Sequence, residues 1–397
     1  MKPELIKWID RRIGTLLCRF FSLINFLIPN KKKDQPTQKV LFIKLIEQGA
    51  SVLAYSALKE AVDQYGKENI YFLVFKENRP ILDLLDVLES KNILEINNDS
   101  FVRFAVDISK AIFNIRSKGI DSCIDMEFFS RASVLIAFLT GARKRVGLFS
   151  FTSEHPYRGS LITHKIHYNP YVHVSNYYLM LVRALKEKPV HEPLLKSEIK
   201  EYKTTLPKVT ISNEVVESLK SKISLPPNCD KIVVLNPNAG DMLPIRKWET
   251  ENFKEIMNSL RNDYPKIAIV FTGVAQERAR IDALLEGKSD SFIINSAGLT
   301  SLMELMALYQ ISNVVVTNDS GPAHFASMFN TNVVVLFGPE TPDLFAPKGE
   351  HIHVIYKKLA CSPCVNVFNH RFSPCKDNVC MKTITANEVY EKVKAVI

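Results

Sequence analysis

The sequence predicts an α/β protein of two successive domains, each an open parallel sheet covered by helices on both faces. Continuously apolar segments alternate with amphipathic ones along most of the chain, as in βαβ units. The alternation occurs twice, over residues 39–188 and 231–384, and a proline-rich linker at 189–230 separates the two runs. A chain of 397 residues is long enough for two such domains.

Residues 1–38 form a separate basic segment. Residues 1–33 carry eight Lys or Arg against two acids, so 8 − 2 = +6 of the formal net charge of +9 lies there. The rest of the chain lacks the broad positive surface of a duplex-binding protein, which excludes nucleic acid as a partner. Apolar residues recur at the spacing of an amphipathic helix, namely Leu5, Ile9, Ile13, Leu16, Phe20, Ile24 and Leu27.

Two placements of this N-terminal helix remain open. Its most apolar part is interrupted by Arg19 and falls short of the roughly 20 residues that span a bilayer. The helix can pack on its own domain, or it can lie in an anionic membrane surface, where Lys31, Lys32 and Lys33 would add attraction. No small-residue cleavage site follows the apolar run, which disfavours a signal peptide.

In the first domain we expect four strands, each followed by a helix. The strands are short and rich in β-branched and aromatic residues, and they lie at 39–45, 69–75, 92–96 and 121–126. The helices show apolar residues at helical spacing and lie at 50–62, 80–88, 101–115 and 130–141.

In the second domain we expect five strands, at 231–237, 266–273, 291–298, 313–319 and 332–339. The helices between and after them are expected at 251–260, 276–285, 301–309 and 322–329, and a closing helix at 385–397. Ser301 and Glu304 form the S-x-x-E pattern of a capping box at the start of one of these helices.

Polar residues collect after strand 313–319, in the sequence DSGPAH. Ligands of open parallel sheets bind outside the carboxyl ends of the strands, here in the cleft between the two domains. Pro322 suits the first turn of a helix, so the helix begins at Gly321 or Pro322 with free N–H groups directed at a phosphate. Ser320 and His324 face the same region. The alternative is an ordinary helix cap with a core histidine.

Two further turns suit a nucleotide diphosphate. The turn after strand 231–237 begins with small residues, from Asn238 to Gly240. It also carries Arg246 and Lys247, which can neutralise a diphosphate leaving group. In the turn after 266–273, Glu277 can accept hydrogen bonds from ribose hydroxyls. Solvated surface loops are the alternative for both. Neither G-x-G-x-x-G after a first strand nor a P-loop motif occurs, which lowers the rank of NAD enzymes and P-loop NTPases.

Together these motifs resemble glycosyltransferase family 9, the ADP-heptose lipopolysaccharide heptosyltransferases. The resemblance is closest in the second domain, in NPNAGDMLPIRKW, TGVAQER, NDSGPAHFAS, VVVLFGPETP and the late CSPC. It runs more loosely, but in order, through the first domain, in VLFIKLIEQGASVLAYSAL, CIDMEFFSRASVLIAFLTGARKRVGL and HYNPYVHVSNYYLMLVRAL.

The resemblance implies two Rossmann-like domains that face each other across a cleft, the GT-B arrangement, with an acceptor domain at 39–188 and a donor domain at 231–384. It implies inverting, metal-independent transfer of heptose or a similar sugar, with no catalytic cofactor, from a nucleotide-diphosphate donor, ADP-linked, to a lipid-linked saccharide such as a lipopolysaccharide core. The protein would be cytoplasmic, at the inner membrane surface. By position, the residues that contact the donor would be Lys247, Glu277, Thr300, Asp319, Ser320, Gly321 and His324.

The sequence departs from the family at the expected base. Family members have Gly-Asp after the first strand, and that aspartate is regarded as the base that deprotonates the acceptor hydroxyl; here the pair is Gly49-Ala50. Another base must lie within reach of the hydroxyl. The substitutes are Glu47 and Glu127, then Asp125, and last His155. The competing hypotheses are a catalytically impaired nucleotide-sugar-binding or scaffold protein of the same fold, and a nucleotide-sugar epimerase.

The acceptor side is less specified. Cations that suit phosphorylated or carboxylated sugars, or else form a solvated basic face, are Arg131, Arg143, Arg145, Arg158, His164 and His173.

Four of the seven cysteines lie close together near the carboxyl end, at Cys361, Cys364, Cys375 and Cys380. Their spacing is close to that of a structural zinc site, with His370 as a spare ligand. Two disulfides or packed thiols are the alternatives.

Overall fold

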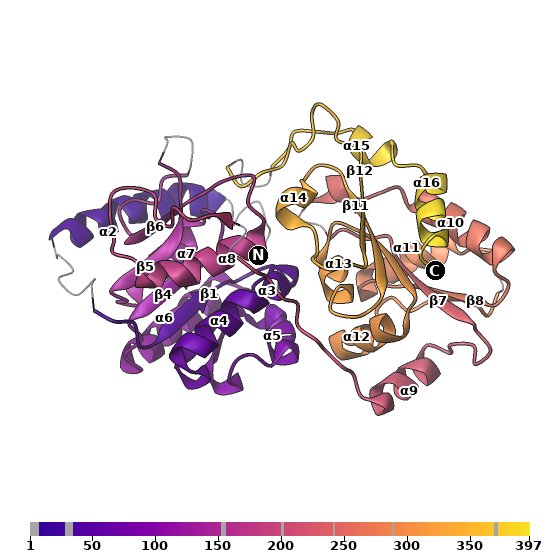
Figure 1. Cartoon of the computed structure of the whole chain (residues 1–397), viewed down its shortest axis with the longest axis horizontal. Coiled ribbons are helices and arrows are strands. Elements are labelled where there is room, and N and C mark those ends of the chain that lie inside the picture. Colours follow the sequence, from indigo (N-terminus) through magenta and orange to yellow (C-terminus); the bar gives the residue numbers. More distant parts are fainter. Residues whose placement is uncertain are drawn as a thin grey trace. The chain divides into compact units, whose positions relative to one another are not determined.

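A computed structural model describes most of the chain. The described residues are 8–27, 35–151, 156–199, 202–240, 243–287, 290–368 and 372–397. The chain divides into two compact units, unit 1 (Met1–Thr205) and unit 2 (Leu206–Ile397). The boundary between the units lies inside the segment 189–230 (Figure 1).

Unit 1 contains a six-stranded sheet in the order β3-β2-β1-β4-β5-β6, and every neighbouring pair is parallel. The strands are β1 (Val40–Ile43), β2 (Ile70–Phe75), β3 (Ile93–Ile96), β4 (Ser122–Asp125), β5 (Lys144–Phe149) and β6 (His164–His167). The helices are α3 (Gln48–Leu53), α4 (Tyr55–Tyr65), α5 (Arg79–Leu85), α6 (Phe101–Ser117), α7 (Arg131–Leu139) and α8 (Val174–Arg183). Short 3-10 turns lie at η2 (Lys67–Asn69), η3 (Lys76–Asn78), η4 (Ser90–Asn92) and η5 (Ala184–Lys186).

Unit 2 repeats this plan in the order β12-β11-β10-β7-β8-β9, again with parallel pairs only. Its strands are β7 (Lys231–Asn236), β8 (Ile267–Phe271), β9 (Ile293–Asn295), β10 (Val314–Asn318), β11 (Asn332–Phe337) and β12 (Ile352–Tyr356). Its helices are α9 (Asn213–Lys222), α10 (Thr250–Asp263), α11 (Arg278–Leu284), α12 (Leu302–Ile311), α13 (Gly321–Ala326), α14 (Pro342–Phe345), α15 (Val379–Lys382) and α16 (Ala386–Lys394), with 3-10 turns at η7 (Pro244–Arg246) and η8 (Ala275–Glu277).

Several local predictions are confirmed in unit 2. Helix α13 begins at Gly321, with Ser320 as its N-cap residue. Helix α12 begins with the predicted capping box, in which Ser301 accepts from the Glu304 N–H and Glu304 accepts from the Ser301 N–H. The closing helix α16 packs against α10 and the hydrophobic core of unit 2.

The N-terminal helix is present as a π-helical turn, η1 (Asp10–Gly14), that continues into α2 (Thr15–Leu27). Leu5 of the predicted stripe lies outside the described residues, and Ile13, Leu16, Phe20 and Leu27 are exposed. The helix therefore packs on unit 1 through a different side from the one that the apolar spacing marked. Among the described residues, no helix combines the length and the apolar character that crossing a bilayer requires.

Both sheets place their first strand in the middle, beside the fourth. In unit 1 the chain leaves β1 in one direction across the sheet and returns to β4 on its other side, and in unit 2 β7 and β10 are related in the same way. The loops that follow two such strands diverge, and ligands of open α/β sheets bind in the crevice that this divergence leaves at the carboxyl ends. The topology thus singles out the loops after β1, β4, β7 and β10.

Candidate functional site

In unit 2 the Asn318 amide connects the end of β10 to the loop after β7. The Asn318 Oδ1 atom accepts from the Trp248 N–H at 3.0 Å, and the Asn318 amide donates to the Asn238 carbonyl at 3.2 Å. Trp248 is fully buried, and its Nε1–H donates to the Ile384 carbonyl at 2.8 Å. The turn that carries Lys247 is therefore anchored to the end of β10.

The start of α13 lies at the same place. Asp319 and His324 are buried, and the Ser320 hydroxyl donates to the Asn318 carbonyl at 3.1 Å instead of capping the helix. At Gly321 an added Cβ would meet only the Phe325 ring, at 3.5 Å, so the backbone has space on this side. The predicted group of Asp319, Ser320, Gly321 and His324 is thus one continuous turn, with the histidine packed inside it.

A buried ionic cluster explains Asp319, whose negative charge fits poorly beside phosphates. Arg246 Nη1 lies 3.5 Å from Asp319 Oδ2 and 3.6 Å from Glu340 Oε2. Burial, and then the charge of Asp319, raise the pKa of Glu340 to about 8, and burial also raises the pKa of Asp319. Glu340 follows β11 and was absent from the candidate residues, because only the sheet order brings that loop beside Arg246.

The remaining donor candidates lie along the same carboxyl edge. Asn238 donates to the Thr272 carbonyl at 3.2 Å, and Glu277 accepts from the Val274 N–H at 2.9 Å. An added Cβ at Gly273 would lie 2.7 Å from both Asn238 Nδ2 and Glu277 Oε2, so these two side chains meet across that glycine. Thr300 is half-buried at the end of the next loop, just before α12.

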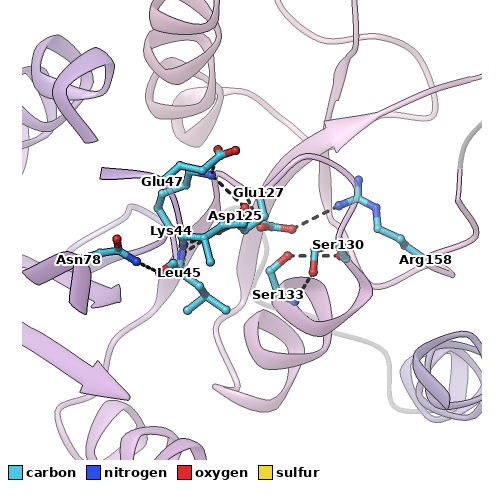
Figure 2. A network of polar contacts seen from close by, with 10 residues as sticks. Lys44, Leu45, Glu47, Asn78, Asp125, Glu127, Ser130, Ser133 and Arg158 are labelled. Atoms are coloured by element: carbon cyan, nitrogen blue, oxygen red, sulfur yellow. Dashed lines mark hydrogen bonds and ion pairs between the residues drawn. The ribbon is translucent and has the colours of Figure 1, made fainter. Parts of the chain in front are cut away.

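In unit 1 the divergent loops after β1 and β4 are joined by a buried lysine (Figure 2). Lys44 Nζ lies 2.9 Å from Glu47 Oε2 and 3.0 Å from Glu127 Oε2, and its side chain is 1% exposed. Glu127 Oε1 also accepts from the Leu45 N–H at 2.7 Å and the Ile46 N–H at 3.3 Å. The Glu127 carboxylate is therefore occupied in holding the two loops together.

Asp125 is engaged in the opposite direction, toward Arg158, as Figure 2 shows. The Arg158 Nη1 atom lies 3.3 Å from Asp125 Oδ2, and both side chains are 2% exposed. Asp125 Oδ1 accepts from the Glu127 N–H at 3.1 Å. Burial raises the pKa of Asp125 to about 6, while Arg158 opposes that rise.

The three candidate bases thus differ in access to solvent. The exposed fraction of the side chain is 23% for Glu47, 9% for Glu127 and 2% for Asp125. Glu47 also has a left-handed backbone, with φ of 72°, at the start of α3. Such conformations are costly for residues other than glycine and concentrate at functional sites. Ala50 is buried in α3, and His155 lies outside the described residues.

Most of the cations suggested for an acceptor are buried inside unit 1, so the alternative of a solvated basic face does not apply to them. Arg131, Arg145, Arg158, His164 and His173 are buried. Arg145, for example, donates to the carbonyls of Ala142 and Leu161, and His173 caps α8 by accepting from the Ser175 N–H. Arg143, which is only partly buried, pairs with Asp121 at 3.6 Å.

The four carboxyl-terminal cysteines lie near one another. Cys361 is exposed, Cys364 and Cys375 are half-buried, and Cys380 is buried. Burial, and then the charges of the other three thiols, raise the pKa of Cys380 to about 11. No disulfide joins them, and in the described part of the chain no three Cys, His, Asp or Glu side chains are arranged to hold a metal ion. His370 lies outside the described residues.

Comparison with known proteins bears on this geometry. The sequence model of glycosyltransferase family 9 (heptosyltransferase) matches residues 109–371, which is well over half of the chain. The chain belongs to glycosyltransferase family 9. The match includes the turn around Lys247, the loop with Glu277 and the start of α13, so the predicted membership is confirmed.

Curated relatives in this family are similar over part of their length. The chain is 25% identical over 169 residues to lipooligosaccharide heptosyltransferase 2 of Campylobacter jejuni, which is 42% of this chain and 52% of that protein. It is 28% identical over 113 residues to lipopolysaccharide heptosyltransferase 2 of Salmonella typhimurium, which is 28% of this chain and 32% of the relative. The chain spans about half the length of the Campylobacter relative.

Solved structures share the fold over nearly the whole chain. The ADP-heptose lps heptosyltransferase II of E. coli has a TM-score of 0.69 at 18% identity, covering 90% of this chain and 98% of that one. The E. coli heptosyltransferase WaaC with ADP has a TM-score of 0.62 at 16% identity, covering 91% and 100%. These likenesses confirm the predicted fold of two parallel α/β sheets.

The ionic cluster of unit 2 predicts a pH-dependent stability. The pKa of Glu340 is raised from 4.5 to about 8 in the folded state, so its stabilising effect is complete below pH 4.5 and is lost as the pH rises toward 8. Glu340→Gln resembles the protonated side chain and removes this loss. The thermal midpoint of the variant should therefore gain on that of the wild type between pH 5 and 8, measured by calorimetry. Parallel pH profiles for the two proteins would contradict the assignment.

Proposed function

We propose that this protein is an inverting glycosyltransferase. It transfers heptose or a similar sugar from a nucleotide-diphosphate donor, ADP-linked, to a lipid-linked saccharide such as a lipopolysaccharide core. The observation that carries the proposal is the pair of diverging loops at β7 and β10 in unit 2, with Lys247 on one and the start of α13 on the other. The family relatives named above, which are lipopolysaccharide and lipooligosaccharide heptosyltransferases and include an ADP-heptose enzyme, support the donor and the acceptor class.

Each part of the nucleotide-sugar donor has candidate binding residues on this edge of the sheet. Lys247 and the N–H groups at Ser320 and Gly321 suit the diphosphate, with Arg246 close behind. Glu277 suits the ribose and Thr300 the base, and Asn238 shapes the turn beside them. Cationic groups at this position stabilise the charge that develops on the leaving diphosphate, which is an interaction that strengthens toward the transition state.

The direct test is donor turnover with nucleotide binding. We expect the pure protein to release a nucleoside diphosphate from one of the ADP-, UDP- or GDP-sugars and to bind that diphosphate in calorimetry. Lys247→Met should weaken the binding by about 10-fold, because one charge-assisted contact of about 1.5 kcal/mol is lost. Lys266→Met is the control, since Lys266 is exposed just before β8, at the amino end of the strand. Absence of binding to all three diphosphates would overturn the proposal.

We propose Glu47 as the base that replaces the aspartate missing at Ala50. In direct displacement the acceptor oxygen bonds to the anomeric carbon, its proton passes to the carboxylate, and the C–O bond to the diphosphate breaks with its electrons on the leaving group. The solvent access of Glu47 and its left-handed backbone support this choice. Glu127 and Asp125 are engaged in holding loops, which supports a positioning role for them.

The base assignment predicts a selective loss of turnover. Glu47→Gln should lower kcat by roughly 100-fold or more and leave nucleotide binding in unit 2 unchanged, because proton transfer is affected and donor contacts are not. Glu127→Gln, measured in parallel, should lower the thermal midpoint as well, since it leaves Lys44 buried with half of its partners. Full activity in Glu47→Gln would refute the base. A wild type that binds the diphosphate and transfers nothing would favour the impaired binding protein instead.

We further propose that Cys361, Cys364, Cys375 and Cys380 hold a structural metal. Four neighbouring thiols are a suitable donor set for zinc or iron, although the described side chains are not arranged as ligands. The solved structure of the glycosyltransferase TibC of E. coli, with a TM-score of 0.52 at 10% identity, is described as iron-containing. The proposed role is in the fold of this region and carries no step of the transfer.

Elemental analysis tests the metal. We expect about one zinc or iron per chain, lost in Cys361→Ala, Cys364→Ala. Cys229→Ala is the matched control, because Cys229 lies in the loop before β7, outside the group of four. A stable protein that is purified without metal and gains none on addition of either ion would rule out the proposal.

We also propose that the protein acts at the inner membrane surface, since its acceptor is attached to a lipid.

A further inference from the structure

The N-terminal helix packs on unit 1 mainly through polar and small residues, together with Phe21, which lies against Phe138. Asp10 Oδ1 accepts from the N–H groups of Arg131 and Ala132 at 3.0 and 2.9 Å, and its Oδ2 lies 3.2 Å from Arg131 Nη1. The carboxylate therefore caps the first turn of α7. One turn later Gly14 is so close that an added Cβ would lie 2.9 Å from the Arg131 Cβ.

The same side of the helix continues this packing along its whole length. Cys18 is fully buried in a cluster with Val134 and Leu161. The Ser22 hydroxyl accepts from the Ser160 N–H at 2.9 Å, and the Asn25 amide donates to the Ser160 carbonyl at 3.1 Å. Figure 1 shows α2 along the side of unit 1 that also carries α7.

The opposite side of the helix is apolar and exposed. Its members are eight large side chains, with exposed fractions from 40% for Leu17 to 81% for Phe26. We call the following residues the outward face: Trp8, Ile13, Leu16, Leu17, Phe20, Leu23, Phe26 and Leu27. The usual arrangement of a surface helix is therefore inverted, since apolar residues normally face the core. An exposed apolar surface of this kind marks a docking site.

The charges around the outward face indicate its partner. Arg11, Arg12 and Arg19 are exposed, while Asp10, the sole acid in residues 8–27, is turned toward Arg131. In the sequence, Lys31, Lys32 and Lys33 follow the helix. A helix with Trp and Phe on one side and cations beside them is typical of segments that lie in the headgroup region of an anionic membrane.

We propose that the outward face binds an anionic lipid bilayer, with the helix lying in the plane of the membrane surface. The polar contacts on the other side hold the helix against unit 1, so a helix bound to the membrane would bring unit 1 to the membrane surface with it. The apolar side chains enter the interface, and the arginines pair with lipid phosphates. This inference deepens the proposed location at the membrane and is independent of whether the protein transfers a sugar.

Vesicle flotation of the full chain, without donor or acceptor, tests the proposal. We expect the protein to float with vesicles of phosphatidylcholine mixed with phosphatidylglycerol and to remain behind with phosphatidylcholine alone. Leu16→Glu with Leu23→Glu should lower the partition coefficient by about 10-fold or more. Arg11→Gln with Arg12→Gln and Arg19→Gln should lower it by roughly 100-fold, at about 1 kcal/mol for each cation. Phe113→Glu is the matched control, since Phe113 on α6 is 76% exposed and belongs to another helix.

A second readout distinguishes insertion from mere adhesion. The chain has two tryptophans, Trp8 on the outward face and Trp248 in the core of unit 2. Trp8 should shift to shorter emission wavelength on addition of the mixed vesicles, in the wild type and in the Phe113→Glu control. Unchanged emission, or variants of the outward face that float like the wild type, would overturn the proposal. A dimer in size-exclusion chromatography that Leu16→Glu with Leu23→Glu dissociates would overturn it in favour of a second copy of the chain.

Discussion

The parallel register of the two sheets is the constraint on which the remaining structure depends. Each first strand pairs with the second strand on one side and with the fourth on the other. The chain therefore continues in opposite directions across the sheet from this point, and the loops that follow the first and the fourth strand diverge. Each unit then places a buried polar connection at the separation. In unit 1 it is Lys44 between two glutamates, and in unit 2 it is Asn318 between the end of β10 and the loop after β7.

These two connections have different chemical character. The lysine connection is ionic, and removal of one partner would leave a charge buried. The amide connection is neutral, so it fixes the distance between the two segments without adding a charge to the site. In unit 2 the ionic connection is a separate one, between Arg246 on the loop after β7 and Asp319 after β10.

Much of the fold could be predicted from the sequence, and the exceptions have physical reasons. Strands such as β1 and β10 are buried at every position and mostly apolar, because both faces of a parallel sheet are covered. Strands β5 and β6 were not expected, since Lys144, Arg145 and His164 interrupt their apolar character. Those side chains are buried nonetheless, because carbonyl groups such as that of Leu185 accept their hydrogen bonds.

The apolar spacing of the N-terminal helix located the helix but left its placement open, and the structure packs it on unit 1 through Gly14 and Cys18, which lie against α7. The site was predictable where it follows the chain locally, as at Ser320 and Gly321. It was not predictable where it depends on sheet order, as for Glu340 beside Arg246, or for the accessibility that separates Glu47 from Glu127.

The Asn318 amide has a consequence for how a ligand would be received. Its oxygen and its nitrogen are both hydrogen-bonded to main-chain groups of the loop after β7. The distance between that loop and the end of β10 is therefore fixed by the dimensions of one carboxamide. Aspartate or leucine would match the amide in size, but neither could accept from Trp248 and donate to Asn238 at once. The edge is consequently preorganised: the conformational entropy of these turns is lost when unit 2 folds, and little of it remains to be lost when a ligand binds.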